Sequence, residues 1–92
     1  MSNRFEGEID FRQYLTQVRR RTVNTQNSYV SYMNKLADGN GGHVCPGCLY
    51  DDRTLADILN QMALTEKQHN DLRSAGRAYY ACFKGADAIR HV

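Results

Sequence analysis

Residues 22–37 carry the clearest periodic pattern in the chain, and they most strongly constrain its fold. Their apolar side chains recur at the spacing of one face of an α-helix: Tyr29, Met33, Leu36 and Ala37. Thr22 can cap the first turn with its hydroxyl, and a glycine-rich run at residues 38–42 ends the pattern. The opposite face is polar and almost uncharged, which suits either water or a polar partner. This segment predicts an amphipathic helix whose apolar face must be covered by other helices.

Similar patterns predict three further helices, at residues 9–20, 53–63 and 65–84. In the first of these, the apolar positions are Phe11, Tyr14, Leu15 and Val18. Residues 1–8 show no such pattern and are expected to be a loosely held lead-in, whereas residues 38–52 form a long loop rich in glycine and cysteine. Together these elements predict an all-α protein, a small four-helix bundle in a single domain spanning residues 1–92.

Local signals place the ends of the last two predicted helices. Asp52 or Thr54 can begin the third, and Thr54 has an acidic residue three positions on, as in a capping box. Thr65 and Gln68 form a second capping box at the start of the fourth helix. Gly85 is expected to end that helix, because glycine is the commonest residue just beyond a helix C-terminus.

The charge balance of the chain limits the functions that bulk composition can indicate. Twelve Lys and Arg against ten Asp and Glu leave a formal net charge of +2 over 92 residues. This is too weak to indicate nucleic-acid binding by itself, so such a function must depend on clustered charges.

No apolar run is long enough to span a membrane, and the N-terminus lacks the apolar core of a signal peptide. We therefore expect a cytoplasmic protein without a membrane partner.

The sharpest local motif is His43-x-Cys45-Pro46-Gly47-Cys48 in the long loop. A Cys-x-x-Cys turn can direct two thiolates at one ion, as in structural zinc sites, and His43 would supply a third ligand. The fourth ligand is open among several residues: Asp51, His69, Cys82 and His91. The alternative is a flexible loop with free thiols; a redox dithiol is less favoured, since no βαβ pattern surrounds the motif.

Arginines form the densest positive charge in the sequence, at Arg19, Arg20 and Arg21. They can meet phosphates or an acidic protein surface, or they can simply end a helix favourably. Arg73 and Arg77 lie one helical turn apart and would extend this patch if the first and fourth helices were neighbours. Tyr79 shares the apolar stripe of its helix and is expected in the core, whereas its neighbour Tyr80 is offset and free to make contacts.

Two segments resemble a known family. The pattern Thr22-x-x-Thr25-x-x-x-Tyr29 and the later TEKQHNDLRSAGRAYY are similar to the long helix and the last helix of the SAM-like core-binding domain of phage integrases and other tyrosine recombinases. The resemblance covers roughly residues 9–84. It implies DNA binding by these side chains: Thr25, Asn27, Lys35, Arg73 and Arg77. In that family a separate domain carries the nucleophilic tyrosine, so the resemblance implies no catalysis of strand exchange by this chain.

Two functions are compatible with these features. The first is a non-catalytic module that binds duplex DNA, from a phage or another mobile element. The alternative is a small phage-type inhibitor, similar to anti-CRISPR proteins, that binds a host nucleoprotein complex through its arginines. No Ser/His/Asp group, paired carboxylates or phosphate loop is recognisable, so we expect neither an enzyme nor a small-molecule substrate.

Overall fold

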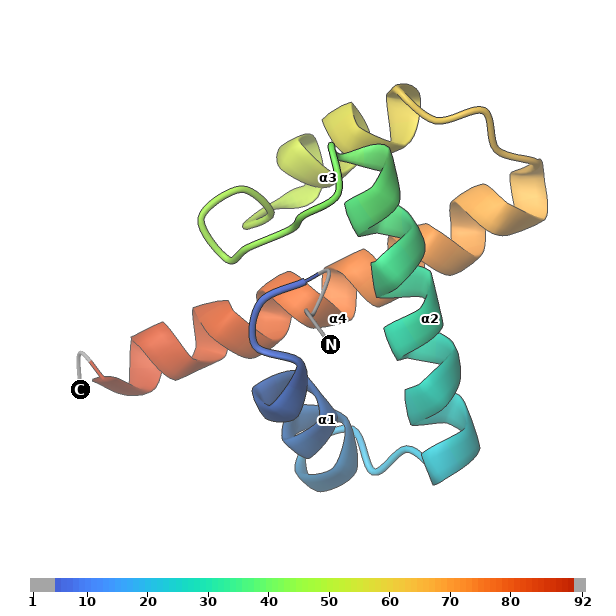
Figure 1. Ribbon diagram of the computed structural model, residues 1–92. Coiled ribbons are helices and arrows are strands. Elements are labelled where there is room, and N and C mark those ends of the chain that lie inside the picture. The colour runs from blue at the N-terminus through green and yellow to red at the C-terminus, as the bar shows by residue number, and fades with distance from the viewer. Residues whose placement is uncertain (1–4, 91–92) are drawn as a thin grey trace.

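The computed structural model describes residues 5–90, and their side chains through residue 83. It contains four helices, shown in Figure 1: α1 (Glu8–Gln17), α2 (Val23–Gly39), α3 (Asp52–Asn60) and α4 (Glu66–Arg90). Within the described residues the only β-type pairing is an isolated parallel bridge between Phe5 and Val44. The prediction of a small all-α four-helix bundle is therefore confirmed. None of the described helices has the length and apolar character that crossing a membrane requires.

α2 and α4 form the centre of the bundle, because each of them packs against all of the other three helices. α2 crosses α4 and contacts α1 toward one of its ends and α3 toward the other (Figure 1). In the described part of the chain, α1 and α3 make no close contact with each other. Surfaces built on α1 and on α3 are thus separate surfaces of this molecule.

An aromatic cluster occupies the centre of the core. Tyr79 of α4 is fully buried and meets Phe5 and Phe11 edge to face, at ring-centroid distances of 5.9 and 5.8 Å. Such pairs contribute about 0.5–1.5 kcal/mol each beyond the area they bury. The expected core position of Tyr79 is confirmed, whereas Tyr29 is only half-buried. The buried apolar face of α2 consists of Val30, Met33, Leu36 and Ala37.

The N-terminal segment, residues 5–7, is held firmly against this core. Phe5 is fully buried. The Glu6 amide donates to the Val44 carbonyl at 2.8 Å, and the Glu6 carbonyl accepts from the Tyr79 hydroxyl at 2.8 Å. The prediction of a loose lead-in was wrong here, because one isolated aromatic residue carries no periodic signal of burial.

Several helix ends differ from their predicted positions, and one of them is the end of α3, which lies at Asn60 rather than residue 63. α1 ends at Gln17 rather than residue 20, which leaves Val18 65% exposed instead of in the core. α3 begins after Asp51, whose carboxylate accepts from the Thr54 amide at 2.8 Å. Acidic and hydroxyl residues cap equally well from adjacent positions, so local pattern did not distinguish among them. α4 continues past Gly85 to Arg90, since a glycine costs a helix only about 1 kcal/mol.

The two predicted threonine caps are confirmed. The Thr25 amide donates to the Thr22 hydroxyl at 3.3 Å. At α4, the Thr65 amide donates to the Gln68 side chain at 3.1 Å, and the Gln68 amide returns a bond to the Thr65 hydroxyl at 3.2 Å. The first cap places the positive end of α2 immediately after the three arginines.

Candidate functional site

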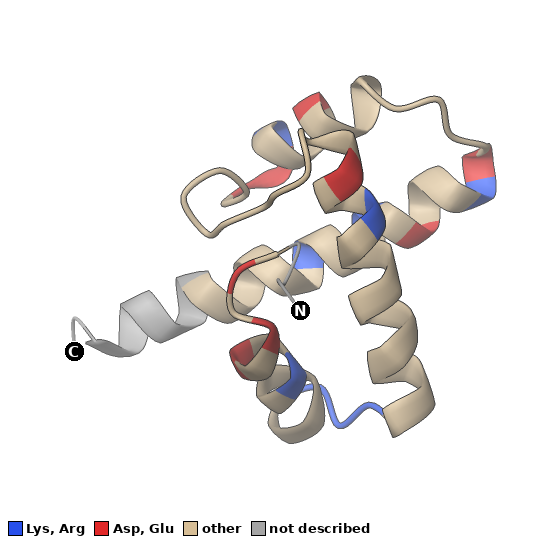
Figure 2. Cartoon of the chain, in the orientation of Figure 1, with Lys and Arg blue, Asp and Glu red and all other residues tan. Residues whose placement is uncertain are grey.

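The arginine linker, residues 18–22, joins α1 to α2 and carries Arg19, Arg20 and Arg21 (Figure 2). Its backbone folds back on α1: the Arg19 amide donates to the Tyr14 carbonyl at 3.2 Å, and the Arg21 amide to the Leu15 carbonyl at 2.8 Å. Arg20 adopts a positive φ of 53°. That conformation is uncommon for a residue with a side chain, so the surrounding bonds must hold it.

Gln26 fixes the linker from the α2 side. It is the one buried polar residue of the described core, 8% exposed, and its side-chain amide donates to the Thr16 hydroxyl at 2.8 Å and to the Arg21 carbonyl at 3.1 Å. The sequence did not reveal this role, because Gln26 lies on the polar face of the predicted helix and nothing local marks it as buried. Through these two hydrogen bonds, Gln26 connects α2 to both α1 and the linker.

The three guanidinium groups have different surroundings. Arg19 lies over the Tyr14 ring, 5.6 Å from its centroid, and its Nε donates to the Tyr14 hydroxyl at 3.2 Å. Arg20 and Arg21 are exposed, and within the described residues neither has an ion-pair partner. These two are the charges that remain available to a binding partner.

The predicted binding residues of α2 are divided along the helix. Thr25 and Asn27 lie in its first turns, close to the linker, and the Asn27 side-chain oxygen accepts from Arg12 at 3.1 Å. Lys35 is exposed near the opposite end, where it lines a shallow hollow with Thr65 and Lys67 at the start of α4. Only Thr25 and Asn27 therefore belong to the same surface as the arginine linker.

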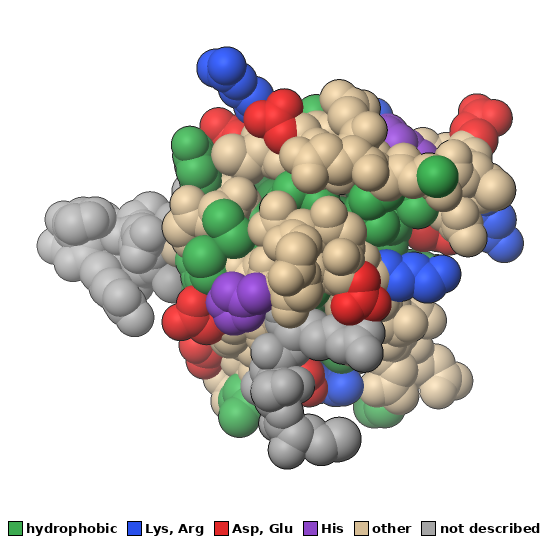
Figure 3. Space-filling model, turned by 45° about the horizontal axis from the view of Figure 1, so that its top comes forward, with side chains coloured by type: hydrophobic (Ala, Val, Ile, Leu, Met, Phe, Trp, Pro, Cys, Tyr) green, Lys and Arg blue, Asp and Glu red, His purple; other side chains and the backbone are tan. Residues whose placement is uncertain are grey.

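Arg73, Arg77 and Tyr80 lie on the side of α4 that faces α3. The Arg77 Nε is 3.1 Å from the Asp52 carboxylate, to which the Tyr80 hydroxyl also donates. The Tyr80 bond and then the Arg77 bond lower the pKa of Asp52. Arg73 borders a hollow lined by α3 residues such as Leu55. α1 and α4 are neighbours, but these arginines of α4 face α3 and therefore do not extend the arginine patch of the linker. Figure 3 shows one face of the molecule, on which the basic side chains lie apart from one another.

The cysteine loop, residues 43–48, is a second irregular segment with a defined shape. Cys45 and Cys48 close a turn in which the Cys48 amide donates to the Cys45 carbonyl at 3.0 Å. Their sulfur atoms lie 3.2 Å apart, and the Cys45 amide donates to the Cys48 sulfur at 2.9 Å. Val44 and Leu49 are fully buried on either side of the turn, so the core holds the two thiols close together.

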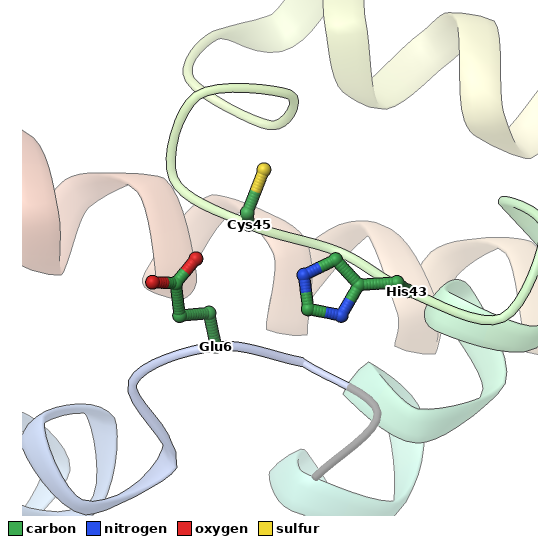
Figure 4. Close-up of side chains that lie close together, drawn as sticks. All are labelled: Glu6, His43 and Cys45. Carbon is green, nitrogen blue, oxygen red and sulfur yellow. The ribbon is translucent and has the colours of Figure 1, made fainter.

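A group that could hold a metal ion forms where this loop meets the N-terminal segment. Ligand atoms of Glu6, His43 and Cys45 all lie within 4.8 Å of one another. Figure 4 shows Glu6 on the N-terminal segment and His43 and Cys45 on the loop, with the Cys45 sulfur directed away from the other two side chains in this view. His43 and Cys45 were predicted ligands, whereas Glu6 was missed, because only tertiary contact brings it to the loop.

The other residues considered for the fourth ligand position lie elsewhere or are engaged. Asp51 caps α3, and His69 lines the hollow beside Arg73. Cys82 is buried with its sulfur 3.8 Å from the Asp10 carbonyl, and burial raises its pKa to about 11, which makes it a poor ligand. His91 lies outside the described residues.

No family model, curated protein or solved structure matches this chain.

Proposed function

We propose that this protein is a non-catalytic module that binds duplex DNA through the arginine linker and the first turns of α2. The observation that carries the proposal is the pair of guanidinium groups of Arg20 and Arg21, which are exposed on a hydrogen-bonded linker and have no ion-pair partner among residues 5–90. Arginine contacts to phosphate supply most of the sequence-independent affinity of DNA-binding proteins. A backbone that is already ordered loses little entropy on binding, which favours affinity.

The start of α2 adds groups suited to the same ligand. A helix N-terminus attracts anions through its unpaired amides and its dipole. Asn24 and Ser28 are exposed beside the linker and can reach phosphate or base edges. With a net charge of only +2, we expect the protein to neutralise few phosphates and to bind with modest affinity. The resemblance to recombinase core-binding domains supports the same function, for a protein of a phage or another mobile element.

Binding of labelled duplex DNA, titrated over a range of salt concentrations, tests the proposal. The R20A/R21A variant should bind more weakly, and the slope of log affinity against log salt should shrink by about 0.9 for each phosphate that the variant no longer neutralises. R53A/K67A is a matched control, because it removes two exposed positive charges from α3 and α4. Equal weakening in both variants, or no binding by the wild type at low salt, would contradict the proposal.

One observation favours a protein partner as the second candidate. Val18 and Val23 flank the arginines and are 65% and 66% exposed. Apolar surface contributes little at a phosphate backbone, whereas arginines beside apolar side chains are typical of protein interfaces. For an inhibitor of a host nucleoprotein complex, V18S/V23S should weaken the complex after nuclease treatment. For a DNA module, the same variant should bind DNA as the wild type does.

We also propose that the cysteine loop binds a structural zinc ion through His43, Cys45 and Cys48. Thiolate and imidazole ligands favour zinc over calcium or magnesium, which prefer oxygen. Binding would release the two thiol protons, so native mass spectrometry of the reduced protein should show the mass of one zinc ion less two protons. Absence of this adduct at micromolar zinc would contradict the proposal.

A further inference from the structure

We propose that Glu6 is the fourth protein ligand of this zinc site, so that the metal fastens the N-terminal segment to the cysteine loop. This inference rests on the proposed zinc ion at Cys45 and Cys48. It goes beyond that proposal in its consequence. A site made only of loop residues would order the loop alone, whereas a Glu6 ligand joins two segments that are distant in sequence.

The backbone of Glu6 is fixed from two sides, which positions its carboxylate. Its amide donates to the Val44 carbonyl and its carbonyl accepts from the Tyr79 hydroxyl, each at 2.8 Å. The neighbouring Phe5 pairs with Val44 as an isolated bridge, and both side chains are fully buried. The side chain of Glu6 itself is exposed, so it is free to turn toward an ion.

The distances suit a tetrahedral ion after small side-chain rotations. Around zinc, with bonds of about 2.0–2.3 Å, neighbouring ligand atoms lie about 3.3–3.8 Å apart. The atoms of Glu6, His43 and Cys45 are within 4.8 Å of one another, and the Cys48 sulfur is 3.2 Å from that of Cys45. The Cys48 sulfur is not part of that group of three, so a four-ligand site requires its side chain and that of Glu6 to turn toward one ion, beside the buried residues Val44 and Leu49.

The set of four also satisfies the chemistry of a structural site. Two thiolates, one imidazole and one carboxylate are all accepted zinc ligands, and four of them leave no position open for a substrate. On binding, the two thiols lose their protons to water.

Zinc titration of the reduced, metal-free chain against a chromophoric chelator tests this inference. E6Q keeps the size of the side chain and removes its charge, and it should lower zinc affinity by about tenfold or more. E66Q, the same change in the exposed first turn of α4, should leave the affinity unchanged. C45S should abolish tight binding, whereas C82S at the buried third thiol should not.

The outcomes separate the two proposals. If C45S retains wild-type affinity, the zinc site itself is wrong. If C45S loses zinc but E6Q binds as tightly as the wild type, the zinc site stands and the role of Glu6 is overturned. Hydrogen exchange gives a second readout: zinc should slow exchange of the Glu6 amide in the wild type and in E66Q but not in E6Q. Equal slowing in all three would also overturn the role of Glu6.

Discussion

The arginine linker and the cysteine loop are the two irregular segments that carry the candidate sites, and different interactions hold them. The linker is held near the surface by hydrogen bonds, two of which come from the buried side chain of Gln26. The loop is held by apolar burial, with Val44 and Leu49 fully inside the core and Phe5 packed alongside. Hydrogen bonds are directional and contribute modestly each, whereas apolar burial contributes more and is less directional.

Because of this difference, we expect substitutions in the two segments to affect stability differently. The guanidinium groups of Arg20 and Arg21 are exposed, so we expect their removal to have little effect on stability. The candidate metal ligands of the cysteine loop are next to buried residues in sequence, so their arrangement and the stability of the fold depend on the same packing. Substitutions at Phe5, Gln26 and Asp52 test this difference.

The largest expected effect is that of Phe5→Ala on stability, because Phe5 is the core residue that pairs with Val44 of the cysteine loop. Removing this fully buried ring should lower the free energy of unfolding by about 3–5 kcal/mol, because it leaves a cavity beside Phe11 and Tyr79. Urea unfolding followed by circular dichroism measures the decrease. Ile9→Ala is the control, since Ile9 is 71% exposed and its truncation should change stability by no more than about 0.5 kcal/mol. If Phe5→Ala lowered the free energy of unfolding no more than the small change expected for Ile9→Ala, the N-terminal segment would not be part of the core.

An intermediate effect is expected in the arginine linker, from Gln26→Ala. The variant lacks two side-chain hydrogen bonds, worth about 0.5–1.5 kcal/mol each, and should be destabilised by about 1–3 kcal/mol. DNA affinity should also fall, although no charge is removed, because Arg21 is no longer held in place. Gln13→Ala, at an exposed site on α1, should change neither quantity. Unchanged DNA affinity in Gln26→Ala would show that order in the linker is unimportant for binding.

The smallest effect concerns the α4 residues that the sequence pattern grouped with the linker. Hydrogen bonds from Tyr80 and Arg77 lower the pKa of Asp52 in the folded state. The stabilisation is therefore complete above the unfolded pKa, about 3.9, and is lost as the pH falls through the lower folded value. The difference in melting temperature between the wild type and Asp52→Asn should accordingly shrink below about pH 4. A difference that stays constant from pH 6 to pH 3 would rule out this ionic link between α3 and α4.

Much of the helical framework could be predicted, because it depends on neighbours in sequence. The caps at Thr22 and Thr65 and the buried positions Met33 and Leu36 followed from spacing and side-chain chemistry alone. The candidate sites could be predicted only in part. The arginines and the Cys-x-x-Cys motif are visible in the sequence, but Gln26 and Glu6 act through partners that lie far away along the chain.

By itself, the sequence determined that the chain is helical and which faces of its helices are apolar, because helix formation and amphipathicity are local properties. Tertiary structure alone decided that Phe5 belongs to the core and that Glu6 meets His43 and Cys45. It also decided that Arg77 pairs with Asp52 instead of extending the arginine linker. The physical reason is that burial and side-chain contact depend on which segments pack together, and that choice is made by the whole core rather than by any one stretch.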